Sequence, residues 1–271
     1  PNDQVISMSL SVDESMIAYL VTSREGDGDN PPSSKLRIRH VKSQNEVEVS
    51  VDHQATGELV AVEFGPSKND ERGPMQHHVL LLGSDAQGRP DRVFLSTIQC
   101  LDEGGPSVLN RIGDDDEPSL LYRSDDPSVI VDVQRTKGCQ FVAVKAMTKT
   151  STEIFLFDGS TNTRTTLRKA TPSANGLQSS NLIAVIPRTE GVEYHLDTSE
   201  QGDILVLVSI DGCDYRLLEA TVNDLPIQPN DLNKYKLDTV DSDETFTLYD
   251  IDLFQNYLVT YERSTIDGLQ R

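Results

Sequence analysis

A strongly apolar segment recurs along the chain at intervals of roughly 60 residues, and this repeat constrains the fold more than any other feature. Each apolar segment is followed by a second strand-like segment, a more polar third segment and a fourth segment that leads into the next unit. The apolar segments begin at Met16, His77, Gln140, Ile204 and Leu258. Their nearly continuous apolar character, as in MIAYLVT from Met16, predicts strands that are covered on both faces.

The remaining segments of the unit are shorter or more polar. They lie at 35–41, 46–51 and 59–64, at 92–98, 119–122 and 129–133, at 153–157, 164–168 and 192–196, and at 215–222, 235–240 and 246–251. The segment 46–51 (EVEVSV) alternates strictly, which is typical of a half-exposed strand. Asp158-Gly159 and Asp211-Gly212 are turn dipeptides between segments. Radially stacked four-stranded sheets need both buried middle strands and wetter outer strands. The sequence therefore predicts an all-β fold, a β-propeller of four-stranded antiparallel blades.

About four to five blades are present on this interpretation. The chain opens on a first strand at 5–11 and closes partway through a fifth unit at 268–271. Because an unpaired sheet edge is usually covered or blunted in native proteins, we expect residues 1–271 to be a single, partial propeller domain that forms part of a larger ring. Long polar loops are expected at 23–34, 66–76, 99–118, 167–181 and 225–233, with helical turns only near Val108 and within 224–235.

Charge and cysteine content narrow the partners and the compartment. Among 271 residues, 44 acidic side chains oppose 24 Lys and Arg, a formal charge of -20. This charge repels nucleic acid and anionic membranes; it either serves solubility alone or attracts cationic peptides. No apolar stretch is long enough for a membrane span, and residues 1–4 have no signal-peptide layout. Cys100, Cys139 and Cys213 form no disulfide framework. A cytoplasmic protein fits best.

The presence and absence of short sequence motifs distinguish among propeller families. The chain has no Trp, which excludes the WD-type repeat and the sialidase box. Residues 11–14 (SVDE) precede an apolar strand, Gly88-Arg89-Pro90 precedes another, and residues 187–194 read PRTEGVEY. Together with 120–159 and 250–269, these motifs resemble the blades of the prolyl oligopeptidase family, above all its oligopeptidase B branch. The chain departs from that pattern at Val12, at Phe155 and at Leu81-Leu82.

The resemblance implies a function for the whole protein. Members of the family carry a seven-bladed propeller followed by a catalytic α/β-hydrolase domain, which is absent from this chain. The propeller would gate the access of short peptides, including basic ones, to a serine-type endopeptidase site. The alternative is a stand-alone propeller that serves as a protein-interaction scaffold without peptidase activity. The implied partners are the hydrolase domain of the same protein and short peptide substrates.

The residues themselves contain no catalytic centre. A nucleophile elbow needs G-x-S-x-G, and no such pentapeptide occurs. Gly65-Pro66-Ser67 and Gly105-Pro106-Ser107 begin the motif but continue differently, in predicted loops. Whether the chain is part of an enzyme therefore depends on the resemblance alone.

No metal-binding or cofactor-binding residue is expected either. Neighbouring His77 and His78 point to opposite faces of a strand and are interpreted as strand-end histidines; His195 is interpreted as a packing residue, and His40 and His53 have no recognisable partner. Acidic loops at 113–118 and at 27–30 lack the EF-hand spacing. Cys139 and Cys213 are expected to be inert, partly buried thiols. We therefore predict no catalytic, cofactor-binding or metal-binding residue.

Overall fold

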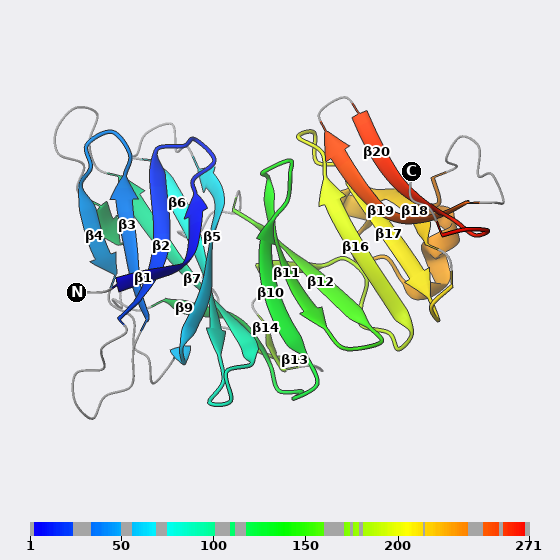
Figure 1. Ribbon diagram of the computed structural model, residues 1–271, viewed down its shortest axis with the longest axis horizontal. Coiled ribbons are helices and arrows are strands. Elements are labelled where there is room, and N and C mark those ends of the chain that lie inside the picture. Colours follow the sequence, from blue (N-terminus) through cyan, green and yellow to red (C-terminus); the bar gives the residue numbers. More distant parts are fainter. Residues whose placement is uncertain are drawn as a thin grey trace.

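A computed structural model describes most of the chain. The described residues are 3–23, 34–49, 56–68, 75–100, 109–111, 118–159, 171–173, 176–178, 181–213, 215–237, 246–254 and 257–268. Within these ranges, twenty strands form five antiparallel sheets that follow one another along the chain (Figure 1). The prediction of an all-β fold built from successive antiparallel sheets is confirmed.

The first two sheets contain the strands up to residue 124 and one later hairpin. The first sheet has the order β1-β2-β3-β4, with bounds Asp3–Leu10, Met16–Ser23, Ser34–His40 and Glu46–Val49. The second runs β5-β6-β7-β9, with β8 also paired to β7, and its strands span Leu59–Lys68, Gln76–Ser84, Pro90–Cys100, Ser119–Ser124 and, for β8, Leu109–Arg111. The hairpin of β13 (Thr171–Ser173) and β14 (Gly176–Gln178) extends this sheet beyond β9.

The remaining three sheets become smaller toward the C-terminus. The third contains β10, β11, β12 and β15, with bounds Ile130–Arg135, Phe141–Met147, Thr152–Asp158 and Leu182–Ala184. The fourth contains β16, β17 and β18, and the fifth β19 and β20, with bounds Val192–Thr198, Ile204–Ile210, Arg216–Ala220, Phe246–Phe254 and Tyr257–Ser264. Two short 3-10 helices, η2 (Val222–Asp224) and η3 (Pro229–Lys234), follow β18. No helix among the described residues is long and apolar enough to cross a membrane.

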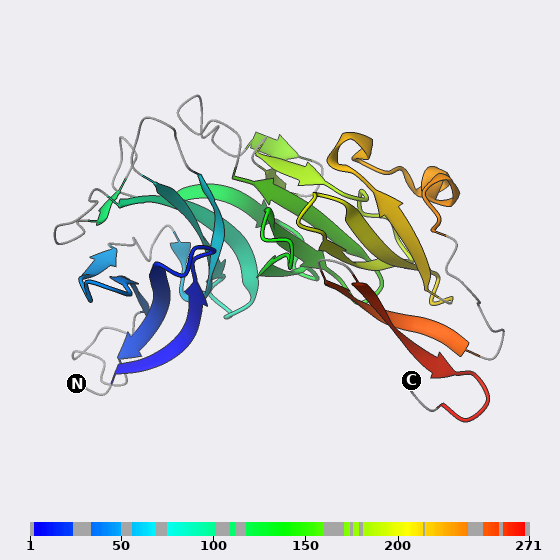
Figure 2. The ribbon, with the colours of Figure 1, turned by 90° about the horizontal axis from the view of Figure 1, so that it is seen from above.

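The five sheets lie side by side along an arc, with the first and last sheets at its two ends (Figures 1 and 2). The first strand of each sheet, namely β1, β5, β10, β16 and β19, is an edge strand of its sheet, and these strands occupy the concave side of the arc, whereas β13, β14 and the 3-10 helices lie on the convex side. At the inner edge, the hydroxyls of Ser7 and Ser9 accept hydrogen bonds of 3.2 and 3.0 Å from the amides of Val62 and Phe64. The inner strands of neighbouring blades are therefore hydrogen-bonded to each other on the concave side.

Apolar side chains fill the space between each pair of successive sheets. One cluster joins the first two sheets around Leu20 and Phe64, and the next joins the second and third around Leu80 and Val144. Two further clusters continue in the same way to the fifth sheet. Because each middle strand is covered on both faces, all but the first residue of β6 are buried. This arrangement explains why the repeating apolar segments are nearly continuous.

Motif residues fasten neighbouring blades at the rims of the sheets. In the turn after β1, the Ser11 hydroxyl accepts a 2.9 Å hydrogen bond from the Met16 amide and donates one of 2.7 Å to Asp13. In the turn after β6, the Arg89 guanidinium donates to the carbonyls of Asp126 and Val129 in the next blade, at 2.6 and 3.0 Å. These residues therefore shape turns and connect sheets.

The segment 187–194 has the same structural role between the third and fourth sheets. The Arg188 guanidinium lies 3.7 Å from the Glu153 carboxylate in β12. The buried Tyr194 hydroxyl accepts hydrogen bonds from the amides of Ile154 and Ile186, at 2.6 and 3.2 Å, and donates one of 2.9 Å to the Ile186 carbonyl. Gly191 has φ of +78°, and a Cβ there would lie 2.2 Å from the Asp211 carboxylate, so glycine is required.

Some expected segments differ from the structure. The predicted strand 164–168 and Val108 lie outside the described residues, and the strand that pairs with the outer side of β12 is β15. The predicted loop 167–181 contains the β13–β14 hairpin, because this excursion pairs with the edge of the neighbouring sheet. Strand β5 continues through residue 68, beyond the loop start expected at Pro66, because a bulge carries the pairing past the proline.

We predict that Tyr194→Phe lowers the free energy of unfolding by about 1–3 kcal/mol, because buried backbone groups lose their hydrogen-bond partner. Urea denaturation followed by circular dichroism measures the change. Tyr257→Phe is the matched control, since Tyr257 is 73% exposed. Equal stabilities of the two variants would contradict this role of the Tyr194 hydroxyl.

Candidate functional site: a polar cleft at the inner edge of three blades

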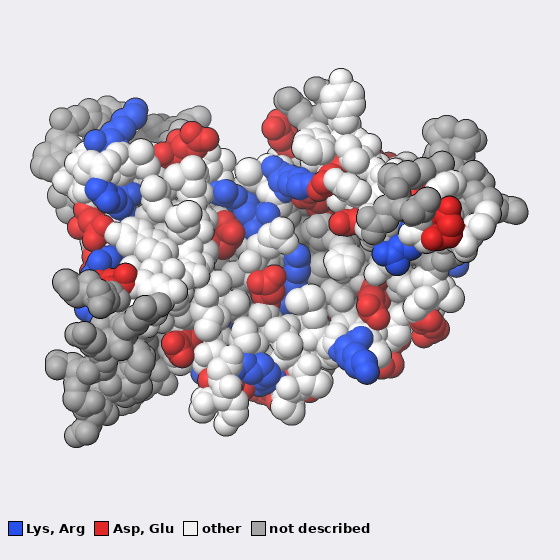
Figure 3. Space-filling view, in the orientation of Figure 1, with Lys and Arg blue, Asp and Glu red and all other residues white. Residues whose placement is uncertain are grey.

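A cleft of about 240 Å³ opens between β10, β11, β16 and β19, where three blades meet at the inner edge. Seven titratable side chains line it, namely Arg135, Lys137, Lys145, His195, Asp197, Asp250 and Asp252. Three cations and three carboxylates are balanced there, although the chain as a whole has a formal charge of -20. On the face shown in Figure 3, positive and negative side chains are mixed over the inner strands in the middle of the molecule. The charges that line the cleft are therefore balanced, whereas the protein as a whole is acidic.

Lys137 joins all three blades at one end of the cleft. It lies in the turn between β10 and β11, and its ammonium is paired with the carboxylate of Asp252 in β19 and lies 3.7 Å from that of Asp197 in β16. The same ammonium is 5.3 Å from the centre of the Phe254 ring, within cation–π range. The hydroxyl of Tyr261 donates a 2.7 Å hydrogen bond to Asp252, which fixes that carboxylate. We call this set the Lys137 clasp.

Backbone hydrogen bonds fasten the turn that carries Lys137. The Asp197 carboxylate accepts hydrogen bonds from the amides of Lys137 and Thr198, at 2.8 and 2.9 Å. The amide of Gly138 donates a 2.9 Å bond to the Thr198 carbonyl. A Cβ on Gly138 would lie 2.2 Å from the Ser199 carbonyl oxygen, so only glycine allows this approach. The position of Lys137 is thus set by the fourth sheet as well as by its own.

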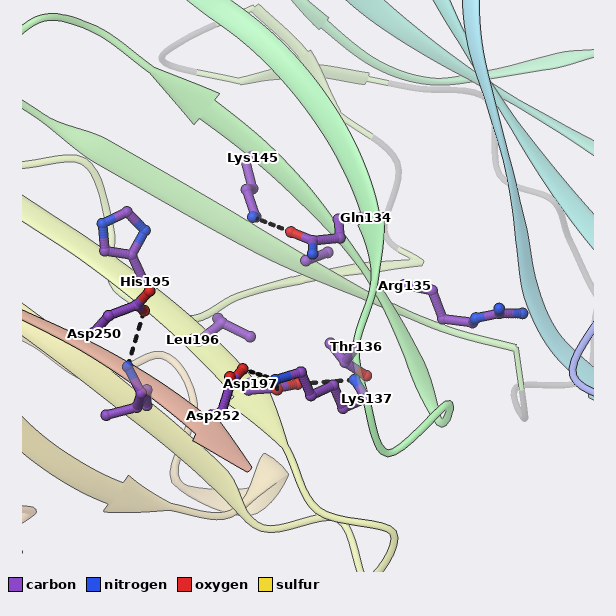
Figure 4. A pocket seen from close by; sticks show the side chains of 12 residues that line it. Gln134, Arg135, Thr136, Lys137, Lys145, His195, Leu196, Asp197, Asp250 and Asp252 are labelled. Carbon is purple, nitrogen blue, oxygen red and sulfur yellow. Dashed lines mark hydrogen bonds and ion pairs between the residues drawn. The ribbon is translucent and has the colours of Figure 1, made fainter. Parts of the chain in front are cut away.

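Lys145 occupies the other part of the cleft, with a different set of partners. Its ammonium donates a hydrogen bond to the side-chain oxygen of Gln134 on the paired strand (Figure 4). No carboxylate of the described residues lies within ion-pair distance of it. Burial lowers the pKa of Lys145, while the charges of Asp132 and Asp197 act in the opposite direction. Lys145 is a half-buried cation whose direct partner is neutral.

His195 lies beside Lys145 at the mouth of the cleft (Figure 4). Its ring centre is 6.2 Å from that of Tyr215, and the side chain is exposed to the cleft. The surrounding protein lowers the pKa of His195, chiefly because it displaces water, and the Lys145 charge adds to this; Asp250 and Glu193 oppose it. His195 was expected to be a packing residue, and this expectation is wrong because β16 turns the ring toward the cleft.

Arg135 points away from the other labelled side chains, toward a neighbouring strand (Figure 4). Its guanidinium donates a 2.7 Å hydrogen bond to the Leu10 carbonyl and lies 3.9 Å from the carboxylate of Glu63. The Ser9 hydroxyl donates a 2.6 Å bond to the same carboxylate. Arg135 therefore connects the third blade with the first two along the concave side.

The other histidines lie in β6, in β3 or outside the described residues. His77 and His78 lie close to the start of β6, which begins at Gln76, and both are buried because sheets cover both faces of this strand. The His77 ring lies 3.1 Å from the Ser67 hydroxyl and that of His78 3.2 Å from the Thr97 hydroxyl. His40 contacts the Ser43 hydroxyl at 3.0 Å. Among the described residues, no group of three or more His, Cys, Asp or Glu is placed to hold a metal ion.

The remaining candidates do not gather at the cleft. Ser67 is a cross-strand partner of His77, in β5 rather than in a loop. Cys139 is half-buried at a turn with φ of +58°, and Cys213 is exposed rather than partly buried. The side chain of Cys100 is not described. His53, Ser107 and the acidic loops at 27–30 and 113–117 lie outside the described residues.

Sequence reasoning missed the cleft. Its residues come from four strands of three blades and a turn. Some of them lie in the stretches 120–159 and 250–269 that resemble the family, but no pattern in those stretches marks them as a site. One available signal was charge beside the fourth segment of a unit, because Asp197 and Asp252 directly follow the segments 192–196 and 246–251. Lys145 was another signal, because it is a charge inside a strand that otherwise reads FVAVKAM. Charge in a buried strand indicates a functional or paired site.

We predict that two substitutions in this cleft have opposite effects on stability. Lys137→Met leaves the Asp197 and Asp252 carboxylates without their shared cation and lowers the free energy of unfolding by about 1 kcal/mol, a modest loss because the pair is partly solvated. Lys145→Met removes a buried charge without a carboxylate partner and raises the free energy of unfolding. Urea denaturation of both variants tests this. An equal loss of stability in both would contradict the distinction between the two lysines.

Comparison with known proteins supplies the family. The model of the prolyl oligopeptidase N-terminal beta-propeller domain matches residues 108–269, more than half of the chain. A search of curated proteins finds no match. The matched region contains the third and fourth sheets, the fifth sheet and the whole cleft.

Solved structures agree on the fold. Oligopeptidase B from Trypanosoma brucei, with covalently bound antipain in a closed form, is 22% identical with a TM-score of 0.58, over 99% of this chain and 30% of that one. Oligopeptidase B from Leishmania major is 17% identical with a TM-score of 0.60, over the same shares. Prolyl oligopeptidase B from Galerina marginata, bound to a 25mer macrocyclization substrate, is 10% identical with a TM-score of 0.51, over 99% and 35%. The chain spans about a third of the length of these proteins.

On the strength of the matched domain model and the arc of antiparallel blades, the chain belongs to the prolyl oligopeptidase N-terminal β-propeller domain family.

Proposed function

We propose that this chain is the non-catalytic propeller portion of a serine oligopeptidase of the oligopeptidase B type, and that it gates the access of short peptides to a hydrolase active site. The observation that supports this most is the arrangement of the inner strands. Their edges face the concave side of the arc (Figure 2), and polar contacts between blades hold them together there. A braced inner wall excludes folded proteins while a flexible peptide can pass.

Exposed apolar side chains at both ends of the arc support a larger ring. Met8 of the first blade is 74% exposed and Tyr257 of the fifth is 73% exposed. Val5 and Phe254 are each 52% exposed. We infer that further blades cover these faces in the natural protein.

The acidic charge of the chain supports short cationic peptides as substrates and disfavours nucleic acid and anionic membranes as partners. Three widely spaced cysteines fit a reducing compartment, so we place the peptidase in the cytoplasm. Cleavage itself is assigned to the hydrolase domain and not to any residue of this chain.

We predict that the intact natural protein cleaves a fluorogenic peptide with Arg or Lys before the scissile bond, and spares a folded protein that contains the same sequence in a surface loop. Its activity should be lost after treatment with a fluorophosphonate, a reagent specific for active serines. The 271-residue chain alone is the matched control and should show no turnover. Equal cleavage of the peptide and the folded protein, or a natural protein with no reactive serine, would overturn the proposal.

A further inference from the structure

We propose that Lys145, Gln134 and His195 form a carboxylate-binding subsite, which takes the free C-terminal carboxylate of a short peptide. The three side chains lie on the same side of the cleft, on β11, β10 and β16 (Figure 4). We call them the Lys145 subsite. The inference rests on the proposed function, because it assumes that short peptides reach the concave side of the arc.

The two lysines of the cleft differ in a way that singles out Lys145. Two carboxylates pair with Lys137, so its charge is compensated within the protein. Lys145 has only the neutral Gln134 oxygen as its hydrogen-bond partner among the described residues. In a chain with 44 acidic residues, a half-buried ammonium without a carboxylate partner is unusual and is costly to maintain. An external carboxylate would supply the missing partner.

Hydrogen-bond donors line the same part of the cleft. The Lys145 ammonium has three donors, of which Gln134 uses one, and the Gln134 amide nitrogen carries two more. Neither ring nitrogen of His195 makes a hydrogen bond within the described part of the chain, so the ring can donate as well. A carboxylate has two oxygens that accept several hydrogen bonds from such donors, and the charged ones are the strongest.

The acids around the subsite restrict what it can take. Asp132 and Asp197 lie close enough to attract Lys145, and Asp250 and Glu193 act on His195. Their negative field opposes a polyanion such as nucleic acid, while the exposed Asp250 can attract a cationic group on the same ligand. The cleft of about 240 Å³ has room for the terminal residues of a peptide and not for a folded chain. A short peptide with one carboxylate and a positive charge fits these limits.

The test is isothermal titration calorimetry of the full 271-residue chain with the peptide Ala-Ala-Lys as the free acid and as the C-terminal amide. We expect the free acid to bind at least tenfold more tightly than the amide, because the amide lacks the charged acceptor. Lys145→Met should weaken binding of the free acid roughly tenfold or more and leave the amide unaffected. Lys145→Arg should retain most of the preference, because it keeps the charge.

Lys234→Met is the matched control, since Lys234 is an exposed lysine on η3, on the convex side, and pairs with Asp231. It should bind both peptides as the unchanged chain does. Circular dichroism of every variant excludes unfolding as the cause of a loss. Equal binding of acid and amide, no binding of either, or an effect of Lys234→Met equal to that of Lys145→Met would each overturn the subsite. The size selectivity of the intact peptidase is measured in a separate experiment. The proposed gating function can therefore hold even if the test of the Lys145 subsite gives a negative result.

Discussion

The burial of each sheet between its two neighbours is the constraint on which the rest of this structure depends. A middle strand such as β6 or β17 has almost no exposed side chain, because one apolar cluster covers each of its faces. A single blade has no such cover, so each blade contributes to the stability of the next. The same constraint explains the sequence repeat and fixes the inner strands on one side of the arc.

Polar contacts at the rims then set how the blades are placed. Arg89 and Arg188 connect turns and strands of neighbouring blades, and the Tyr194 hydroxyl satisfies backbone groups between the third and fourth sheets. At the inner edge, Arg135 reaches the first two blades and the Lys137 clasp holds three. These contacts brace the concave wall, which is what a selective entrance requires. Within that wall, Lys145 stands out because no carboxylate of the described residues forms an ion pair with it.

The sequence predicted the fold well and the cleft poorly, for a physical reason. Strands such as 16–23 and 204–210 are encoded by local apolar patterns, and turns by Gly and Asp at fixed places. The PRTEGVEY motif at 187–194 indicates a family, and the structure shows what two of its residues do. Gly191 allows the close approach of Asp211, and the Tyr194 hydroxyl hydrogen-bonds to buried backbone groups. The cleft instead joins residues 134–145 to residues 195–197 and 250–252, which only the packing of three blades brings together. No local pattern encodes such a site. The inward turn of His195 was missed for the same reason.

The most direct test of this account asks which side of the arc faces a peptidase active site. The intact natural protein can be treated with a fluorophosphonate that carries a short photoreactive arm, illuminated and digested, and the crosslinked peptides identified by mass spectrometry. The account predicts crosslinks to the inner strands, with β10 and β16 among them. Crosslinks confined to the convex side, at η3 or the β13–β14 hairpin, or the absence of any labelled serine, would contradict it.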